Sequence, residues 1–342
     1  MEISRKKIPY PVTPALRAYL QHYGRYLDSV PTIYRDLARF SEAIPYESPD
    51  GSKTLWQTVM YPPGEMAELR PKLTRIYATL KMGGASRVAE HLDVERIDFG
   101  EFGNSRPFRI RIINRFNDNF DHYYVKVADA SRLYGLELEH ILSPNRINYL
   151  VHGDTLIEEH IAGIPGDIFI RQHLERDDMN KVRVAKEIVK FNERCFVRLL
   201  GDMRSVNYVV DVTPDFEEVQ YRVRPIDFDQ QSYEGHYKIY LSQFFLDNFP
   251  VVNLVTKLLN TTTIEQYQKE ERTLIGRRFD VAPHRLRALF RVMEAEQLSP
   301  YEKVLSLRQE LADYHRTHVF DQCETMGQLV RCHVELLLQD SR

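Results

Sequence analysis

The chain has 342 residues, 43% of them hydrophobic and 28% charged, which is typical of a globular protein with room for two or three domains. Its 46 basic and 49 acidic residues leave a net charge of −3, so we expect neither a nucleic acid nor a membrane surface as partner. The 3 cysteines are too few and too scattered for a disulfide framework or a structural zinc site. With neither an apolar signal region nor an apolar run of membrane-spanning length, a cytoplasmic protein is expected.

The first part of the chain, residues 1–93, is expected to be a helical extension. A Thr-Pro start and apolar residues at helical spacing predict a helix over 13–40, and a second helix is expected over roughly 64–92. Proline, glycine and serine make 44–54 rich in turns. The aromatic residues of this extension would either pack on the next domain or bind a partner, and the sequence does not choose between the two.

From about residue 95 the hydrophobic period changes from that of helices to that of strands. Alternating patterns predict five strands with one helix after the third, in the order 96–99, 108–113, 123–127, 129–142 (the helix), 147–151 and 155–161. Beyond a Pro-Gly pair the pattern is mainly helical, interrupted by strands at 208–212 and 222–226. The sequence therefore predicts an α+β protein with a strand-rich domain over 94–163 and a mainly helical domain over 164–342.

Two short stretches of the helical domain carry the groups that phosphoryl transfer from ATP requires. Asp202 is followed five residues later by Asn207, between an apolar helix and a strand, and Asp227 ends a second hydrophobic strand. One carboxylate can take the proton of an acceptor hydroxyl, while an amide oxygen and a second carboxylate can hold magnesium on the phosphates. The alternative is an exposed loop capped by its own Asx side chains, followed by a strand that ends in a solvated acidic turn.

The order of these elements and motifs resembles the protein-kinase-like fold, and more closely its aminoglycoside-phosphotransferase and small-molecule-kinase branch, over about residues 95–335. That family carries His-Gly-Asp-x-x-x-x-Asn, or His-Arg-Asp-x-x-x-x-Asn, on a loop between a helix and a strand, and an Ile-Asp-Phe strand end. The resemblance implies two lobes, the first a five-stranded antiparallel sheet with one helix and the second mainly helical. It also implies that Asp202 is the catalytic base and that Asn207 and Asp227 are magnesium ligands.

A lysine inside an apolar strand is the next element of the pattern. Lys126 lies within Tyr124–Ala128, where a lone charge is costly unless it is paired. The family places such a lysine on its third strand to hold the α- and β-phosphates, paired with a glutamate of the following helix. That helix offers Glu137 and Glu139, and Glu137 is our choice from the face it shares with apolar neighbours. The alternative is a lysine that extends to solvent from an edge strand.

The remaining nucleotide contacts are implied by position. Gly100, Gly103 and Ser105 lie between the first two strands, where the family places the loop that covers the phosphates, although an ordinary hairpin loop explains the two glycines about as well. His160 and Ile161 lie on the strand whose backbone groups read the edge of the adenine in the family. The resemblance therefore implies ATP and magnesium as cofactors.

The function implied is magnesium-dependent transfer of the ATP γ-phosphate to a hydroxyl. Residues 230–250 lack the Ala-Pro-Glu segment of protein kinases, which favours a small-molecule acceptor and leaves a protein acceptor as the alternative. A pseudokinase or nucleotide-binding scaffold is a second hypothesis, because Leu200 replaces the family's histidine and Asp229 the glycine of Asp-Phe-Gly. Nucleotidyl transfer, which would pass AMP to the acceptor on the same fold, is a third, and a helical interaction protein with chance motifs is a fourth.

Overall fold

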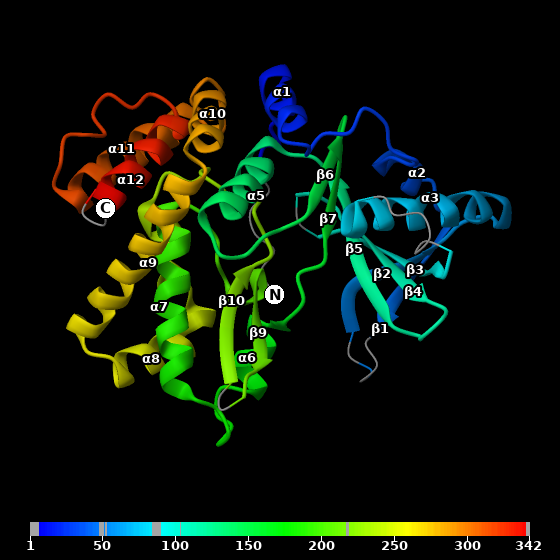
Figure 1. Ribbon diagram of the computed structural model, residues 1–342, viewed down its shortest axis with the longest axis horizontal. Coiled ribbons are helices and arrows are strands. Elements are labelled where there is room, and N and C mark those ends of the chain that lie inside the picture. Colours follow the sequence, from blue (N-terminus) through cyan, green and yellow to red (C-terminus); the bar gives the residue numbers. More distant parts are fainter. Residues whose placement is uncertain are drawn as a thin grey trace. The chain divides into compact units, whose positions relative to one another are not determined.

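A computed structural model describes residues 7–47, 51, 53–83, 90–102, 104–216 and 219–339. The protein is α+β, as the sequence predicts. Its chain forms two compact units (Figure 1), which we call unit 1 (Met1–Ala130 and Ile147–His160) and unit 2 (Ser131–Arg146 and Ile161–Arg342). Each unit is therefore built from two separate stretches of the chain.

Unit 1 contains a seven-stranded antiparallel sheet with the strand order β1-β2-β3-β4-β5-β7-β6. The strands are β1 (Glu42–Glu47), β2 (Lys53–Met60), β3 (Leu92–Gly100), β4 (Phe108–Asn114), β5 (Phe120–Val127), β6 (Tyr149–His152) and β7 (Thr155–Glu159). Its helices are α1 (Pro14–His22), α2 (Tyr34–Leu37) and α3 (Pro63–Met82). The five strands predicted between residues 96 and 161 are confirmed as β3 to β7.

The N-terminal extension is not the helical segment that we expected. Within 44–54, the described residues include the end of β1 and the start of β2, which pair with each other, and β2 adds to the sheet with Trp56 opposite Gly100. Pro45 lies in β1, which is an edge strand and pairs with β2 only. A residue without an N–H group is tolerated there, because one side of the strand has no neighbouring strand to bond. The sheet therefore has two strands more than the predicted five.

The helices predicted in the same extension are shorter than expected. The single helix over 13–40 is replaced by the short helices α1 and α2. The helix expected over 64–92 ends at Met82, because Gly83 takes a left-handed φ of 60° as its C-cap. A helix cannot continue through that conformation, and the chain enters β3 at Leu92.

The two faces of the unit 1 sheet differ in chemistry because successive side chains of a strand point to opposite faces. One face, which includes Val125 of β5, joins α3 in an apolar core with residues such as Leu73, Ile76 and Ile110. The other face is polar and aromatic. It carries Lys126 from the same strand, so the lysine lies on the side of the sheet opposite the α3 core.

Unit 2 is mainly helical. Its helices are α5 (Ala130–Leu142, whose first residue closes unit 1), α6 (Gly166–Gln172), α7 (Lys181–Val197), α8 (Phe249–Leu258), α9 (Thr261–Val281), α10 (Pro283–Glu294), α11 (Tyr301–His315) and α12 (Met326–Gln339). A small antiparallel sheet of order β10-β9-β8 completes it, with β8 (Ile164–Pro165), β9 (Tyr208–Pro214) and β10 (Val219–Pro225). The strands predicted at 208–212 and 222–226 are confirmed as β9 and β10.

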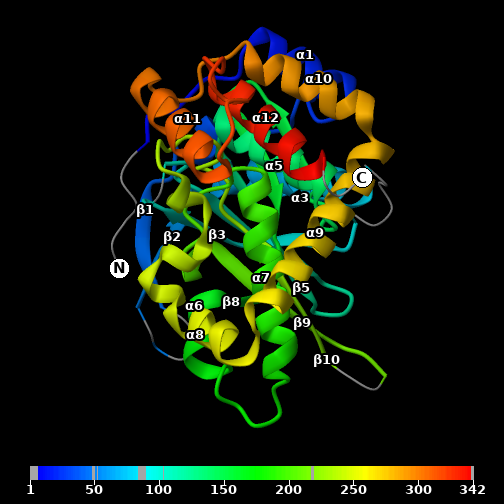
Figure 2. The ribbon, with the colours of Figure 1, turned by 90° about the vertical axis from the view of Figure 1, so that its left-hand side faces the viewer.

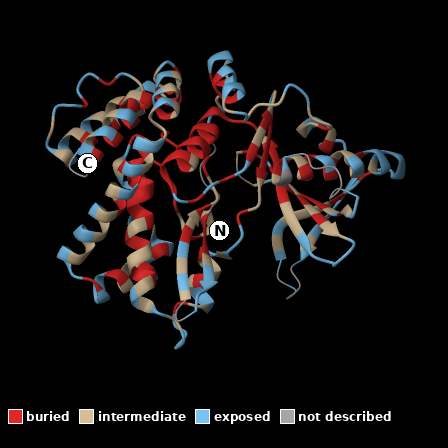
Figure 3. Ribbon diagram, viewed as in Figure 1, coloured by how far each residue is buried: buried red, intermediate tan, exposed pale blue. Residues whose placement is uncertain are grey.

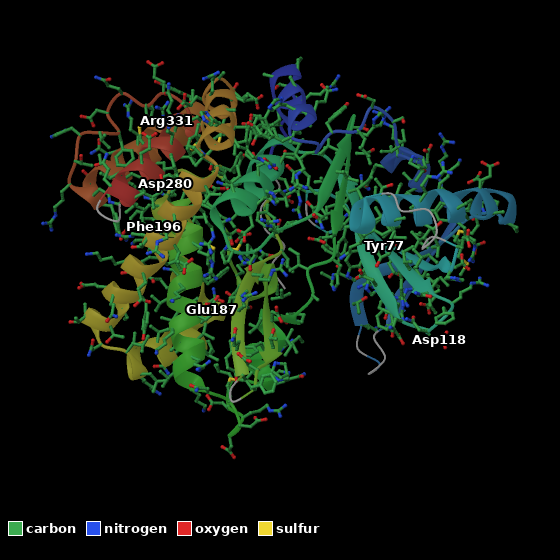
Figure 4. All side chains as sticks on the ribbon, viewed as in Figure 1. Tyr77, Asp118, Glu187, Phe196, Asp280 and Arg331 are labelled. Carbon is green, nitrogen blue, oxygen red and sulfur yellow. The ribbon has the colours of Figure 1, made fainter. Side chains whose placement is uncertain are left out.

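Helix α7 is the central element of unit 2 (Figure 2), in contact with α8, α9, α12 and β10. Burial is concentrated along α5 and α7 (Figure 3). Glu187 and Phe196 mark two levels of α7 (Figure 4), and Phe196 lies close to the point where the helix gives way to the loop that contains Asp202. Within the described ranges, no helix combines the length and the apolar character needed to cross a membrane.

Candidate functional site

Asp202 lies in a loop after α7 whose backbone is held from several sides. Its φ is 58°, a left-handed value that is uncommon outside glycine but tolerated by Asp. The N–H of Asp202 donates to the carbonyl of Ile239 at 3.1 Å, and the N–H of Gly201 donates to that of Gln230 at 3.2 Å. Backbone in this region persists when the surroundings over-determine it, so these contacts fix the position of the carboxylate.

Asn207 closes the same loop onto Asp202. It ends the short 3-10 helix η1 (Ser205–Asn207), and its Nδ2 donates to the backbone carbonyl of Asp202 at 2.7 Å and to Oδ2 at 3.4 Å. The amide group is planar, and its nitrogen is directed at Asp202. The amide oxygen Oδ1 therefore points away from Asp202, and this is the atom that a magnesium site would use.

Asp227 reaches the loop at the end of β10. The N–H of Ile226 donates to the carbonyl of Asn207 at 2.9 Å, which joins the strand end to the loop directly beside Asp227. The charge of Asp227 is near enough to contribute to a raised pKa of Asp202. The three residues predicted as base and metal ligands thus lie together in unit 2.

The environment of Asp202 favours proton uptake. Burial is the main cause that raises the pKa of its carboxyl to about 6, and the charges of Asp227 and Asp247 act in the same direction. Arg204 opposes them, because its Nε donates to Oδ1 of Asp202 at 2.9 Å. A carboxyl with a pKa near the operating pH is suited to general-base catalysis. The Asp-x-Arg spacing was the only sequence signal for Arg204, and our prediction did not include this residue.

Arg132 of α5 is a second residue of the site that the sequence analysis missed. Its Nη1 donates to Oδ1 of Asp227 at 3.0 Å and to Oδ1 of Asp229 at 2.8 Å, and its Nη2 donates to the carbonyl of Ile226 at 3.4 Å. The Arg132 side chain is 2% exposed. In the sequence, the sign of this role is a charged residue near the start of a mostly uncharged helix.

Lys126 lies in unit 1, where it forms an ion pair with a residue that the sequence analysis did not name. Its Nζ is 2.5 Å from Oε2 of Glu158 on the neighbouring strand β7, and both side chains are buried. Glu137, the predicted partner, lies in unit 2, where Arg285 of α10 binds both of its carboxylate oxygens, with a shortest distance of 2.8 Å. A pair of Lys126 with Glu137 would join the two units, and it stays a prediction.

The predicted phosphate loop connects β3 and β4. Gly100 is the last residue of β3, and Gly103 lies outside the described residues. Ser105 is buried, and its carbonyl accepts a hydrogen bond of 3.2 Å from the N–H of Val127. This bond places the loop at the end of β5, next to the strand position of Lys126. A contact of the loop with phosphate remains a prediction.

The residues predicted to lie near the adenine follow β7. The ring Nδ1 of His160 is 3.2 Å from the hydroxyl of Tyr124, and burial lowers the pKa of this histidine. Ile161 is buried and is the first residue after β7 that belongs to unit 2. A contact of these residues with adenine stays a prediction.

No protein-family model matches the chain, and no curated protein matches its sequence. Within the described ranges, no three or more His, Cys, Asp or Glu side chains group as a metal site. The pair that could hold magnesium is Asn207 with Asp227. One amide oxygen and one carboxylate suit a hard cation that completes its coordination with phosphate oxygens and water.

Proposed function

We propose that the chain is a magnesium-dependent phosphotransferase that moves the γ-phosphate of ATP to a hydroxyl of a small-molecule acceptor, on a two-lobed kinase-like fold in the cytoplasm. The observation that carries the proposal is the convergence of Asp202, Asn207 and Asp227 from two loops of unit 2. Their hydrogen bonds hold a candidate base beside two oxygen ligands, which is the arrangement that phosphoryl transfer requires.

In the proposed reaction, Asp202 orients the acceptor hydroxyl and takes its proton. The acceptor oxygen forms a bond to the γ-phosphorus while the bond from that phosphorus to the bridging oxygen of ADP breaks, and ADP leaves. Asn207 and Asp227 would hold magnesium, which neutralises charge on the phosphates. Lys126, kept in place by Glu158, would bind the α- and β-phosphates. Most of the rate would come from placement and charge neutralisation, because this transfer asks little covalent chemistry of the protein.

A second candidate function is ATP binding without transfer. It is favoured by Arg132, whose guanidinium contacts both Asp227 and Asp229 and gives this carboxylate pair a positive charge of its own. A scaffold of this kind would bind nucleotide with a reduced need for magnesium. Transfer of AMP by the same residues is distinguished from phosphate transfer by the mass that the acceptor gains.

The proposal is tested by measuring ADP release and acceptor mass over a panel of hydroxyl compounds with ATP and magnesium. We expect Asp202→Asn and Asp227→Asn each to reduce turnover at least about 100-fold, because each removes a group that acts on the reacting atoms. Asp215→Asn, in the exposed turn after β9, is the matched control and should retain full turnover. Unchanged turnover in both site variants would overturn the proposal, and tight ATP binding without product would favour the scaffold.

A further inference from the structure

Helix α5 touches both segments of the candidate site with one face. Arg132, Gly135 and Glu139 follow one another at spacings of three and four residues, which places them on the same side of the helix. Arg132 binds the strand end at Asp227 and Asp229, and Glu139 pairs with Arg198 at the start of the Asp202 loop.

The close approach at Gly135 fixes the distance of α5 from the segment that carries Asp227. A Cβ atom at Gly135 would lie 3.0 Å from Cβ of Phe228 and 3.2 Å from Cβ of Gln231. Both contacts are tighter than ordinary van der Waals separation, so the absence of a side chain is what lets the helix pack this closely. The Arg132 guanidinium is thereby held against the two carboxylates.

The charge balance at this point requires a cation. Asp227 and Asp229 are two residues apart and both accept from the same Nη1, while the Arg132 side chain is 2% exposed. Two carboxylates so close cannot both stay ionised at low cost without a positive partner. Arg132 supplies that partner permanently, whether or not a metal is bound.

The same bond limits how Asp227 can hold a metal. Its Oδ1 accepts from Arg132 and also from the N–H of Asp229 at 3.0 Å. Ligation through both carboxylate oxygens would break these two hydrogen bonds, and ligation by Asp229 would break a third. A divalent cation would also be repelled by the nearby guanidinium.

We propose that Arg132 is a positioning residue that restricts Asp227 to single-oxygen ligation and takes the place of a metal ion at Asp229. The inference rests on the proposed function, because it assigns the electrostatic setting of the metal ligand named there. It implies that removing the guanidinium strengthens binding of a divalent cation, whereas a merely structural role for Arg132 would weaken or not change it.

The test is a titration with Mn²⁺ alone, followed by calorimetry, with the Tm of each variant measured with and without the ion. We expect Arg132→Gln to bind Mn²⁺ at least about 10-fold more tightly than wild type and to gain more in Tm from the ion. Arg132→Lys, which keeps the charge, should remain close to wild type. The matched control is Arg222→Gln, which removes an exposed cation from β10 and should not change the affinity.

A second variant keeps the test decisive if Arg132→Gln does not fold. Asp229→Asn removes one of the two carboxylates that accept from Arg132 Nη1, so more of the guanidinium charge acts at Asp227 and the variant should bind Mn²⁺ more weakly than wild type. Unchanged or weaker affinity in a folded Arg132→Gln, or unchanged affinity in Asp229→Asn, would overturn the inference. Failure of the wild-type chain to bind ATP with magnesium would instead overturn the proposed function, so the two failures are distinct.

Discussion

Glu139 of α5 forms a buried ion pair with Arg198, the residue four positions before Asp202. The two side chains are 0% and 1% exposed, and Nε of Arg198 also donates to the carbonyl of Arg194 at 2.8 Å. The end of α7, where the Asp202 loop begins, is thereby tied to α5. The pair therefore links the stability of unit 2 to the geometry of the candidate site.

Removing one charge of this pair should destabilise the protein strongly. Glu139→Gln leaves the guanidinium of Arg198 buried without its counter-charge, so we expect the free energy of unfolding to fall by about 3–5 kcal/mol. Urea unfolding at neutral pH measures the change. The double variant Glu139→Met with Arg198→Leu replaces both charges by apolar side chains of similar size and should recover most of the loss. A double variant as unstable as the single one would contradict this explanation.

The pH dependence of turnover should report the ionisation of Asp202. A base must be ionised to accept a proton, and the pKa of this carboxyl is raised to about 6. We expect kcat/KM to rise about tenfold per pH unit below that value and to level off above it. Arg204→Gln removes the cation that lowers this pKa, so the midpoint should move to higher pH. A midpoint that does not move would show that another group controls the profile.

A histidine pair in unit 2 should make the protein sensitive to mild acid. Nε2 of His333 on α12 lies 3.1 Å from Nε2 of His315, so one ring donates while the other accepts through an unprotonated Nε2, and the bond is lost when both rings are protonated. Burial lowers the pKa of His315 to about 4 and that of His333 well below its usual value. The unfolded chain therefore binds protons that the folded chain does not, and folding stability falls as the pH drops below about 6.5.

The size of this acid effect can be measured by urea unfolding at several pH values. We expect a loss of about 4 kcal/mol between pH 7 and pH 5, since each of the two histidines contributes about 1.9 kcal/mol over that range when it binds a proton only in the unfolded chain. His315→Gln removes one titrating ring and should flatten the dependence. An equally steep decline in the variant would assign the effect to other groups.

Two cysteines of unit 2 are placed to form a disulfide. The sequence shows them as scattered, yet Sγ of Cys323, just before α12, is 3.5 Å from Sγ of Cys332 within that helix. An S–S bond of about 2.05 Å needs only a small movement. Oxidised glutathione should therefore convert the two thiols to a disulfide and be reduced itself to two molecules of glutathione. The cross-link should raise the Tm, because it constrains the unfolded chain.

The experiment on these cysteines is read by mass spectrometry. The oxidised chain should lose the mass of two hydrogen atoms, and buried Cys195 should keep its thiol as an internal control. Cys323→Ser should abolish the mass change. Lasting attachment of glutathione to Cys332, with no internal bond, would contradict the prediction.

The sequence revealed those parts of the fold that have a regular local pattern. The alternation along β4 and β5 predicted these strands, and the helical spacing of α5 was equally clear. The hairpin of β1 and β2 was missed because Pro45 and the following turn residues are typical of loops. An edge strand tolerates this proline. The two strands become recognisable only in the structure, where β2 pairs with β3.

The candidate site was predictable where its residues are close in sequence and not where they meet through tertiary packing. Asp202 and Asn207 share one loop, so their spacing carried the signal. Arg132 reaches Asp227 from a helix that precedes it by many residues, and Glu158 meets Lys126 across two strands. No local pattern distinguishes these charged partners from solvent-exposed ones, because the pairing depends on register and helix packing.

The interleaved assembly of the two units has a practical consequence for dissecting the protein. The chain passes from one unit to the other after Ala130, after Arg146 and after His160. Dividing the chain at one position therefore cannot separate the two units intact. A fragment that starts at Ile161 would lack α5, and with it Arg132, which pairs with Asp229, and Glu139, which pairs with Arg198. Separate expression of the units calls for permuting or splicing the gene, with α5 transferred to the C-terminal piece.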